Sequence, residues 1–164
     1  MKETQEEKVS IDNKPFYKVT LMDNKGRHLS AVTSWLFLLF GENSPYILEY
    51  KQHQETKAPK GTKIFIFDDP DIAKDFAKWA SETIDYDLYI WKCKASGIRQ
   101  YDFIPTVVHS ETIREFWEGK ARDDIRPPIE GTLVADSITL IEPIMAYYQG
   151  EEVKLNGEAS GEGK

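Results

Sequence analysis

The segment from residue 61 to residue 82 constrains the fold of this chain more than any other. Four apolar residues, Ile64–Phe67, are followed directly by Asp-Asp-Pro and then by apolar residues at helical spacing. A short apolar run bounded by turn residues is typical of a buried strand, and the spacing after it predicts a helix over about 70–82. The acids at the junction can cap that helix, and Pro70 suits its first position. We therefore expect a buried strand that leads directly into a helix.

The expected helix has a broad apolar face that needs a large surface to cover it. Six residues recur at helical spacing on this face, namely Ile72, Ala73, Phe76, Ala77, Trp79 and Ala80. In a chain of this size a β-sheet is the surface that can cover such a face. The pattern predicts that the helix packs on a sheet through this whole face.

The rest of the chain contains more strand patterns than helix patterns. Strands are expected at Phe16–Leu21, Tyr46–Tyr50, Leu88–Ala95 and Gly131–Ile141, the last of them long or bulged and ended by Pro143. A short helix is expected over about 111–118, and residues 51–60 are expected to form a loop. The run Trp35–Phe40 fits either a buried strand or a short core helix. This content predicts an α+β fold, a curved and mainly antiparallel sheet with one main and one short helix.

The chain divides into a central domain with polar ends. Residues 1–12 are polar without periodicity and are expected to form a flexible lead, and residues 13–150 are expected to form a single α+β domain. Residues 151–164 are expected to form a disordered acidic tail, because the end of the chain is rich in Gly, Ser and Glu.

Composition limits the partners and the compartment. The net charge of −7 argues against direct binding to nucleic acid, which needs a basic face, and it permits a basic protein partner. The single cysteine, Cys93, excludes an intramolecular disulfide, and the charged N-terminus lacks the apolar core of a signal peptide. The longest apolar run, Trp35–Phe40, is too short to cross a bilayer. A cytoplasmic protein without membrane contact is the expectation.

The residues that could carry chemistry do not form a known constellation. Asp68, Asp69 and Asp71 resemble metal ligands, but helix capping explains them better. The three histidines, His28, His53 and His109, have no metal-binding spacing, and no P-loop or dinucleotide motif is present. Strand alternation turns Cys93 away from Lys92 and Lys94, which indicates a buried structural thiol. No metal and no cofactor are therefore expected.

Three segments in order, Tyr17–Val19, residues 61–73 and Leu88–Lys94, resemble small bacterial and phage domains of uncharacterised function. In these domains a strand leads into a helix of the Ala-x-x-Phe-Ala type, and their final strand is similar to Gly131–Glu142. More remotely, the layout resembles the half of the ADP-ribosyltransferase fold that packs one helix beside a split sheet. In such transferases an Arg or His on the first strand helps to hold NAD, and a Glu on a late strand orients the ribose. The matching positions are Lys18, which keeps the charge but lacks the planar fork of Arg, and Glu142.

Three hypotheses about function follow. The leading one is a non-enzymatic protein-binding or accessory domain, with a phage or prophage origin implied by the resemblance, because no catalytic constellation is present and aromatic residues are abundant. The alternative implied by the resemblance is an ADP-ribosyltransferase-like enzyme that uses NAD, with Lys18 and Glu142 as catalytic candidates. The second alternative, based on the charge of −7, is an acidic mimic of nucleic acid that blocks a basic protein.

Overall fold

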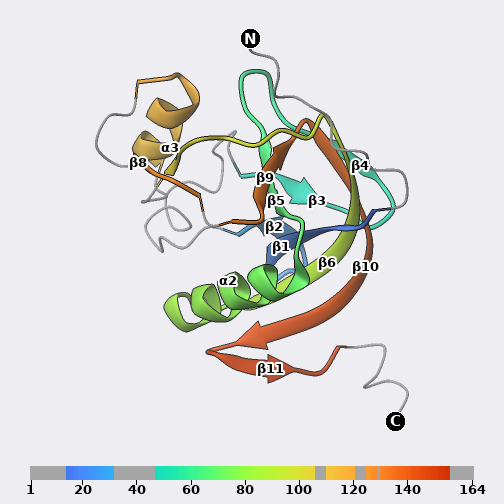
Figure 1. Cartoon of the computed structure of the whole chain (residues 1–164). Helices are drawn as coiled ribbons and strands as arrows, with labels where there is room; N and C mark the ends of the chain where they lie inside the picture. The colour runs from blue at the N-terminus through green and yellow to red at the C-terminus, as the bar shows by residue number, and fades with distance from the viewer. Residues whose placement is uncertain (1–13, 32–46, 106–109, 121–124, 129, 156–164) are drawn as a thin grey trace.

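A strongly curved antiparallel sheet with a helix across one face dominates the computed structural model of the chain (Figure 1). The structure describes residues 14–31, 47–105, 110–120, 125–128 and 130–155. Nine strands form one sheet that does not close on itself, and two short strands pair separately. The predicted α+β class, with a curved and mainly antiparallel sheet, is confirmed.

The elements of the described residues are eleven strands and two helices. The main sheet contains β1 (Phe16–Met22), β2 (His28–Ser30), β3 (Glu49–Tyr50), β4 (Glu55–Lys57), β5 (Ile64–Phe67), β6 (Asp87–Ser96), β9 (Thr132–Ala135), β10 (Ser137–Tyr148) and β11 (Glu151–Val153). The small second sheet pairs β7 (Ile104–Pro105) with β8 (Ile125–Arg126), and the helices are α2 (Pro70–Thr83) and α3 (Ser110–Trp117).

The long strands β6 and β10 form the centre of the main sheet. The strand order is β11-β10-β6-β1-β2-β3, while β5 pairs with both β1 and β9, and β4 pairs with β10. Strand β1 meets β5 only at the pair Tyr17–Phe67 and then continues beside β2, where Thr20 pairs with Ser30. The same edge of β1 therefore pairs with β5 at one end and with β2 at the other, and β5 and β2 diverge from each other.

The two faces of the sheet carry separate cores. On the face that α2 covers, the core contains Val19 and Leu21 of β1 with Leu88 and Ile90 of β6. The core on the opposite face is larger. Its buried residues include Phe16, Ile66, Trp91, Cys93, Leu133, Ile138 and Leu140. The alternation predicted for β6 is confirmed, because Trp91 and Cys93 are buried whereas Lys94 is exposed.

Helix α2 packs on the sheet through its smallest residues. Ala73, Ala77 and Ala80 are fully buried, which lets the helix backbone approach the sheet closely. Trp79 is 53% exposed, and Ile72 and Phe76 are only partly buried. The prediction that the whole apolar face packs on the sheet is therefore wrong, because the alanines turn the bulky residues toward one flank of the helix.

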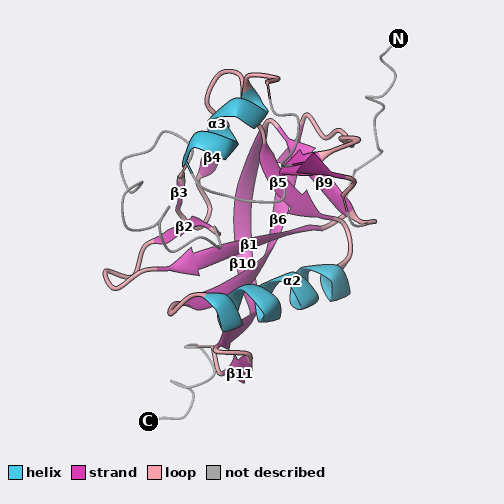
Figure 2. Cartoon of the chain, turned by 90° about the vertical axis from the view of Figure 1, so that its left-hand side faces the viewer, coloured by secondary structure: helices cyan, strands magenta, loops and turns pink. Residues whose placement is uncertain are grey.

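Helix α3 lies away from α2, and the two helices occupy separate parts of the molecule (Figures 1 and 2). Its aromatic residues pack on the ring of Phe65 in β5, with ring centroids 5.7 Å away for Trp117 and 6.5 Å away for Phe116. Tyr101 completes the cluster at 6.2 Å from Trp117. These contacts attach α3 to the same strand that precedes α2.

Several predicted boundaries differ from the structure. Residues 55–57, expected in a loop, form β4, and the expected strand Gly131–Ile141 is two strands separated by Asp136. Strand β10 continues past Pro143 to Tyr148, and its register against β6 shifts on both sides of the proline, as at β-bulges. The start of the acidic tail at residue 151 is also wrong, because Glu151–Val153 pairs with β10. The run Trp35–Phe40 and His109 lie outside the described residues.

Candidate functional site

Lys18, the first predicted site residue, lies inside the protein. Its side chain projects from β1 onto the face opposite α2, and the residue is 7% exposed. The amine Nζ donates a hydrogen bond of 2.9 Å to the carbonyl oxygen of Phe65 and lies 5.3 Å from the ring centroid of Tyr50. It thereby supplies a donor to β5 just beyond the point where β5 separates from β1. Lys18 is engaged in holding the sheet together.

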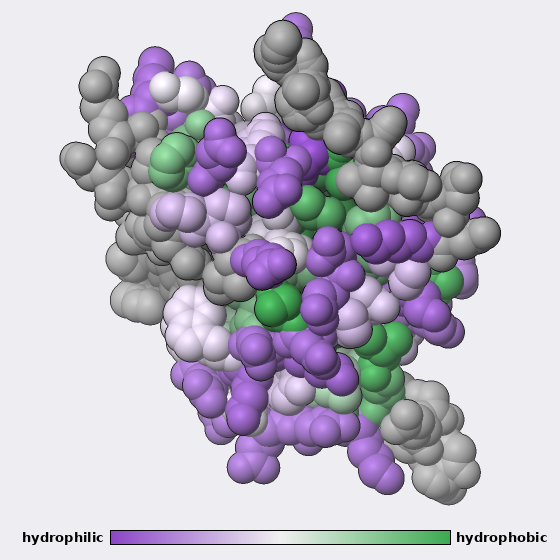
Figure 3. All heavy atoms as spheres, viewed as in Figure 1, coloured by the Kyte–Doolittle hydropathy of each residue, from purple (hydrophilic) through white to green (hydrophobic). Residues whose placement is uncertain are grey.

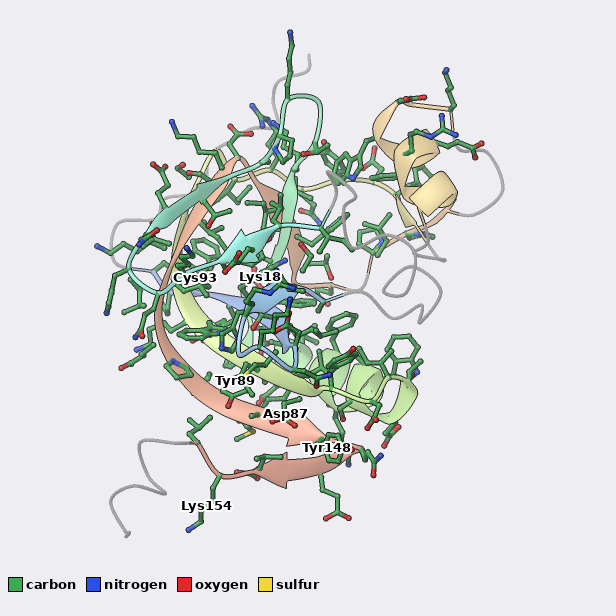
Figure 4. All side chains as sticks on the ribbon, turned by 180° about the vertical axis from the view of Figure 1, so that it is seen from behind. Lys18, Asp87, Tyr89, Cys93, Tyr148 and Lys154 are labelled. Carbon is green, nitrogen blue, oxygen red and sulfur yellow. The ribbon has the colours of Figure 1, made fainter. Side chains whose placement is uncertain are left out.

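Burial also changes the proton affinity of this amine. Removal from water lowers the pKa of Lys18 to about 8, and the nearby Cys93 acts in the opposite direction. The same burial raises the pKa of the Cys93 thiol to about 12, so Cys93 is a neutral buried thiol at pH 7. Figure 4 shows Lys18 and Cys93 close together on neighbouring strands. The predicted structural role of Cys93 agrees with its position.

Glu142, the second predicted site residue, lies on the other face of the sheet. It pairs in register with Lys92, and its carboxylate oxygen lies 3.5 Å from Nζ of Lys92, with the Glu142 side chain 56% exposed. Lys18 pairs with Trp91, the neighbour of Lys92, and consecutive strand residues point to opposite faces. The structure therefore places Lys18 and Glu142 on opposite faces of the sheet and does not bring them together.

A buried polar network that the sequence did not reveal joins β1, β2 and β6. The indole Nε1 of Trp91 donates to the hydroxyl oxygen of Thr20 at 3.0 Å, and that oxygen lies 3.0 Å from Nδ1 of His28. Burial lowers the pKa of His28, although the charge of Asp23 raises it, which favours a neutral ring at pH 7. The Thr20 hydroxyl therefore accepts from Trp91 and also bonds to His28, in a direction that the tautomer of the His28 ring determines. Thr20 is 0% exposed, so its hydroxyl joins β1 to β6 inside the fold, whereas His28 is only partly buried.

Of the acids at the start of α2, Asp69 has the capping role that the sequence predicts. Its side chain accepts a hydrogen bond of 2.8 Å from the backbone N–H of Asp71, and its backbone is extended as in an N-cap residue. The predicted capping is confirmed for Asp69. Among the described residues, no group of three or more His, Cys, Asp or Glu side chains is arranged to hold a metal ion.

The most distinctive surface feature is a row of bulky apolar residues on the flank of α2. Ile72, Phe76 and Trp79 follow one another at helical spacing, and we call them the α2 stripe. The ring centroid of Phe76 lies 5.7 Å from that of Phe67 in β5 and 6.1 Å from that of Trp79. The rings thus lead from the core to the surface and end at Trp79, the most exposed large hydrophobic residue described. The sequence placed these residues on the apolar face of the helix. It did not predict their exposure, because exposure depends on which side of the helix packs on the sheet.

Comparisons with protein families, with curated proteins and with solved structures find no match to this chain. The ADP-ribosyltransferase-like relationship therefore stays a prediction. In the part of the chain that the structure describes, neither helix is both long and apolar enough to cross a membrane. The class of the protein is thus given by its fold, an α+β domain whose main helix carries the α2 stripe with Trp79 exposed at its end.

Proposed function

We propose that this protein is a non-enzymatic binding or accessory domain that contacts another protein through the α2 stripe. The observation that carries the proposal is the position of Trp79, which is 53% exposed at the end of a row of packed rings. Tryptophan is enriched among the residues that contribute most to binding between proteins. Phe76 lies beside the indole, with the ring centroids 6.1 Å apart, so a partner that covers Trp79 extends an existing row of ring contacts.

The positions of the chemically reactive side chains also support a binding role. Lys18 is committed to the carbonyl of Phe65, Cys93 is a buried neutral thiol, and Asp69 caps α2. Each of these groups has a role in the fold that accounts for its residue type. The α2 stripe, by contrast, leaves apolar area exposed that the core does not need.

Capture of partners by the wild-type chain and by two matched variants tests this proposal. Trp79→Asp places a charge on the stripe, and Phe103→Asp makes the same change at a ring that is 49% exposed elsewhere. We expect a specific partner, identified by mass spectrometry, with the wild type and Phe103→Asp, and its loss with Trp79→Asp. Binding of the purified partner to all three proteins then gives the affinities, and circular dichroism checks that they are folded.

Two results would contradict the proposal. Equal affinity of the partner for Trp79→Asp and the wild type would show that the α2 stripe is not the contact surface. Failure of the folded wild type to capture any specific protein would count against the binding function itself.

A further inference from the structure

An acidic row runs along the α2 stripe on its solvent side. The row consists of Asp71, Asp75 and Glu82, which are all exposed. At 100° per residue, Asp75 is about 40° and Glu82 about 60° around the helix from Trp79. Within the described part of the chain, no ion pair neutralises any of these three carboxylates. Figure 3 shows mainly hydrophilic residues over this part of the surface, with a few apolar residues between them.

The lysines of α2 do not border the stripe. Lys74 and Lys78 lie about 100° or more from Trp79, beyond the acidic row. On this side of the α2 stripe, a partner therefore meets the carboxylates of α2 before its lysines. Complementary charge at the rim of an interface speeds association and selects the partner, because like charges are repelled.

We infer that the α2 stripe and the acidic row together bind a basic amphipathic segment of another protein. Its apolar side chains cover Phe76 and Trp79, and its Lys or Arg residues face Asp75 and Glu82. The inference rests on the proposed binding function and adds the chemistry of the partner. The net charge of −7 favours the same partner, because the field of the whole chain attracts a basic segment.

A second copy of this chain is a poor occupant of the same surface. A symmetric contact between two α2 stripes would bring the two acidic rows near each other, between subunits that each carry a charge of −7. Like charges at the rim of such a contact oppose it. Charge complementarity thus favours a basic partner over self-association.

Binding of three labelled peptides, measured by fluorescence anisotropy, tests this inference with the full chain. The first is a helical peptide with a leucine face and a lysine face, the second has glutamate in place of lysine, and the third is oligolysine without an apolar face. We expect the Leu/Lys peptide to bind at least roughly tenfold more tightly than either of the others. Its affinity should fall at about 1 M salt, where the screening length is about 3 Å.

Two charge-reversal variants locate the site. Asp75→Lys/Glu82→Lys reverses two charges of the acidic row, and Glu49→Lys/Glu55→Lys reverses two exposed charges on β3 and β4, which lie away from α2 in Figure 2. Both variants change the net charge by the same amount. We expect the first to weaken binding of the Leu/Lys peptide by roughly tenfold or more, and the second by less than about threefold.

The outcomes separate this inference from the proposed function. Equal binding of the Leu/Lys and Leu/Glu peptides, or equal loss in both charge-reversal variants, would overturn the inference. A natural partner whose capture depends on Trp79 would leave the proposed function standing in that case. Equal binding of oligolysine and the Leu/Lys peptide would also overturn the inference of an amphipathic partner. Recognition would then need charge alone, as expected for an acidic mimic of nucleic acid.

Discussion

The buried amine of Lys18 makes the stability of this protein depend on pH in a direction that can be calculated. Burial lowers the pKa of Lys18 from 10.5 to about 8, so the unfolded chain binds a proton more tightly than the folded protein does. Between these two values the unfolded state holds more protons, and the free energy of unfolding therefore rises with pH. The stability gained from Lys18 appears as the pH rises through about 8.

The magnitude follows from the same two values. One pKa unit corresponds to about 1.36 kcal/mol, and integration between pH 7 and pH 9 gives a rise in the free energy of unfolding of about 1 kcal/mol. Lys18→Met removes this rise. At pH 7 the burial of a charged ammonium group lowers the free energy of unfolding of the wild type. Because the variant lacks this group, its free energy of unfolding rises by about 3 kcal/mol from this cause. The variant also leaves the Phe65 carbonyl without its donor, which costs about 1–3 kcal/mol, so the net change at pH 7 is small and the slope is the informative quantity.

Urea unfolding of the wild type and Lys18→Met at pH 7, 8 and 9 measures the slope. We expect the wild type to gain about 1 kcal/mol relative to the variant over this range. Lys92→Met, at a side chain that is 43% exposed on the other face, controls for the loss of one positive charge. A difference between the wild type and Lys18→Met that does not change with pH would refute the burial of a charged amine at this position.

Two further substitutions test local features of the fold. Asp69→Ala removes the cap of α2 and is expected to lower the free energy of unfolding by about 1 kcal/mol, whereas Asp69→Asn should retain most of it; equal loss in both variants would contradict the capping role. Gly97→Ala is expected to destabilise the protein by more than about 1–2 kcal/mol, because Gly97 has a φ of 67° and an added Cβ would lie 2.7 Å from Cβ of Asp136. Gly26→Ala is the control, since its φ is 80° but no atom lies within 4 Å of the added carbon, and thermal melts that rank the two variants equally would exclude a steric role for Asp136.

The features that could be predicted from the sequence are those determined by residues close together along the chain. The strand at Ile64–Phe67 and the helix after it depend on an apolar run, a cap and a proline that are all within a few residues. The burial of Cys93 follows from alternation along a single strand. The α+β class needed only the numbers and positions of these patterns.

The features that could not be predicted depend on which distant segments meet. Strand β4 is three polar residues long, and only its pairing with Ser137–Thr139 makes it a strand. The bond between Trp91 and Thr20 spans 71 residues and requires the register of β1 against β6. The same register places Lys18 and Glu142 on opposite faces, so their proximity could not be judged from spacing along the chain.

The arrangement of α2 explains why its most apolar residues are also the best candidates for contact with a partner. Burial of a large ring contributes more free energy than burial of an alanine, so a helix optimised for the core alone would turn its rings inward. Here Ala73, Ala77 and Ala80 are fully buried, whereas Trp79 remains 53% exposed. The close approach that the alanines allow leaves no room for a bulky ring between helix and sheet. The rings are instead carried to the flank, beside the acidic row, where the apolar area that folding leaves uncovered remains available for binding.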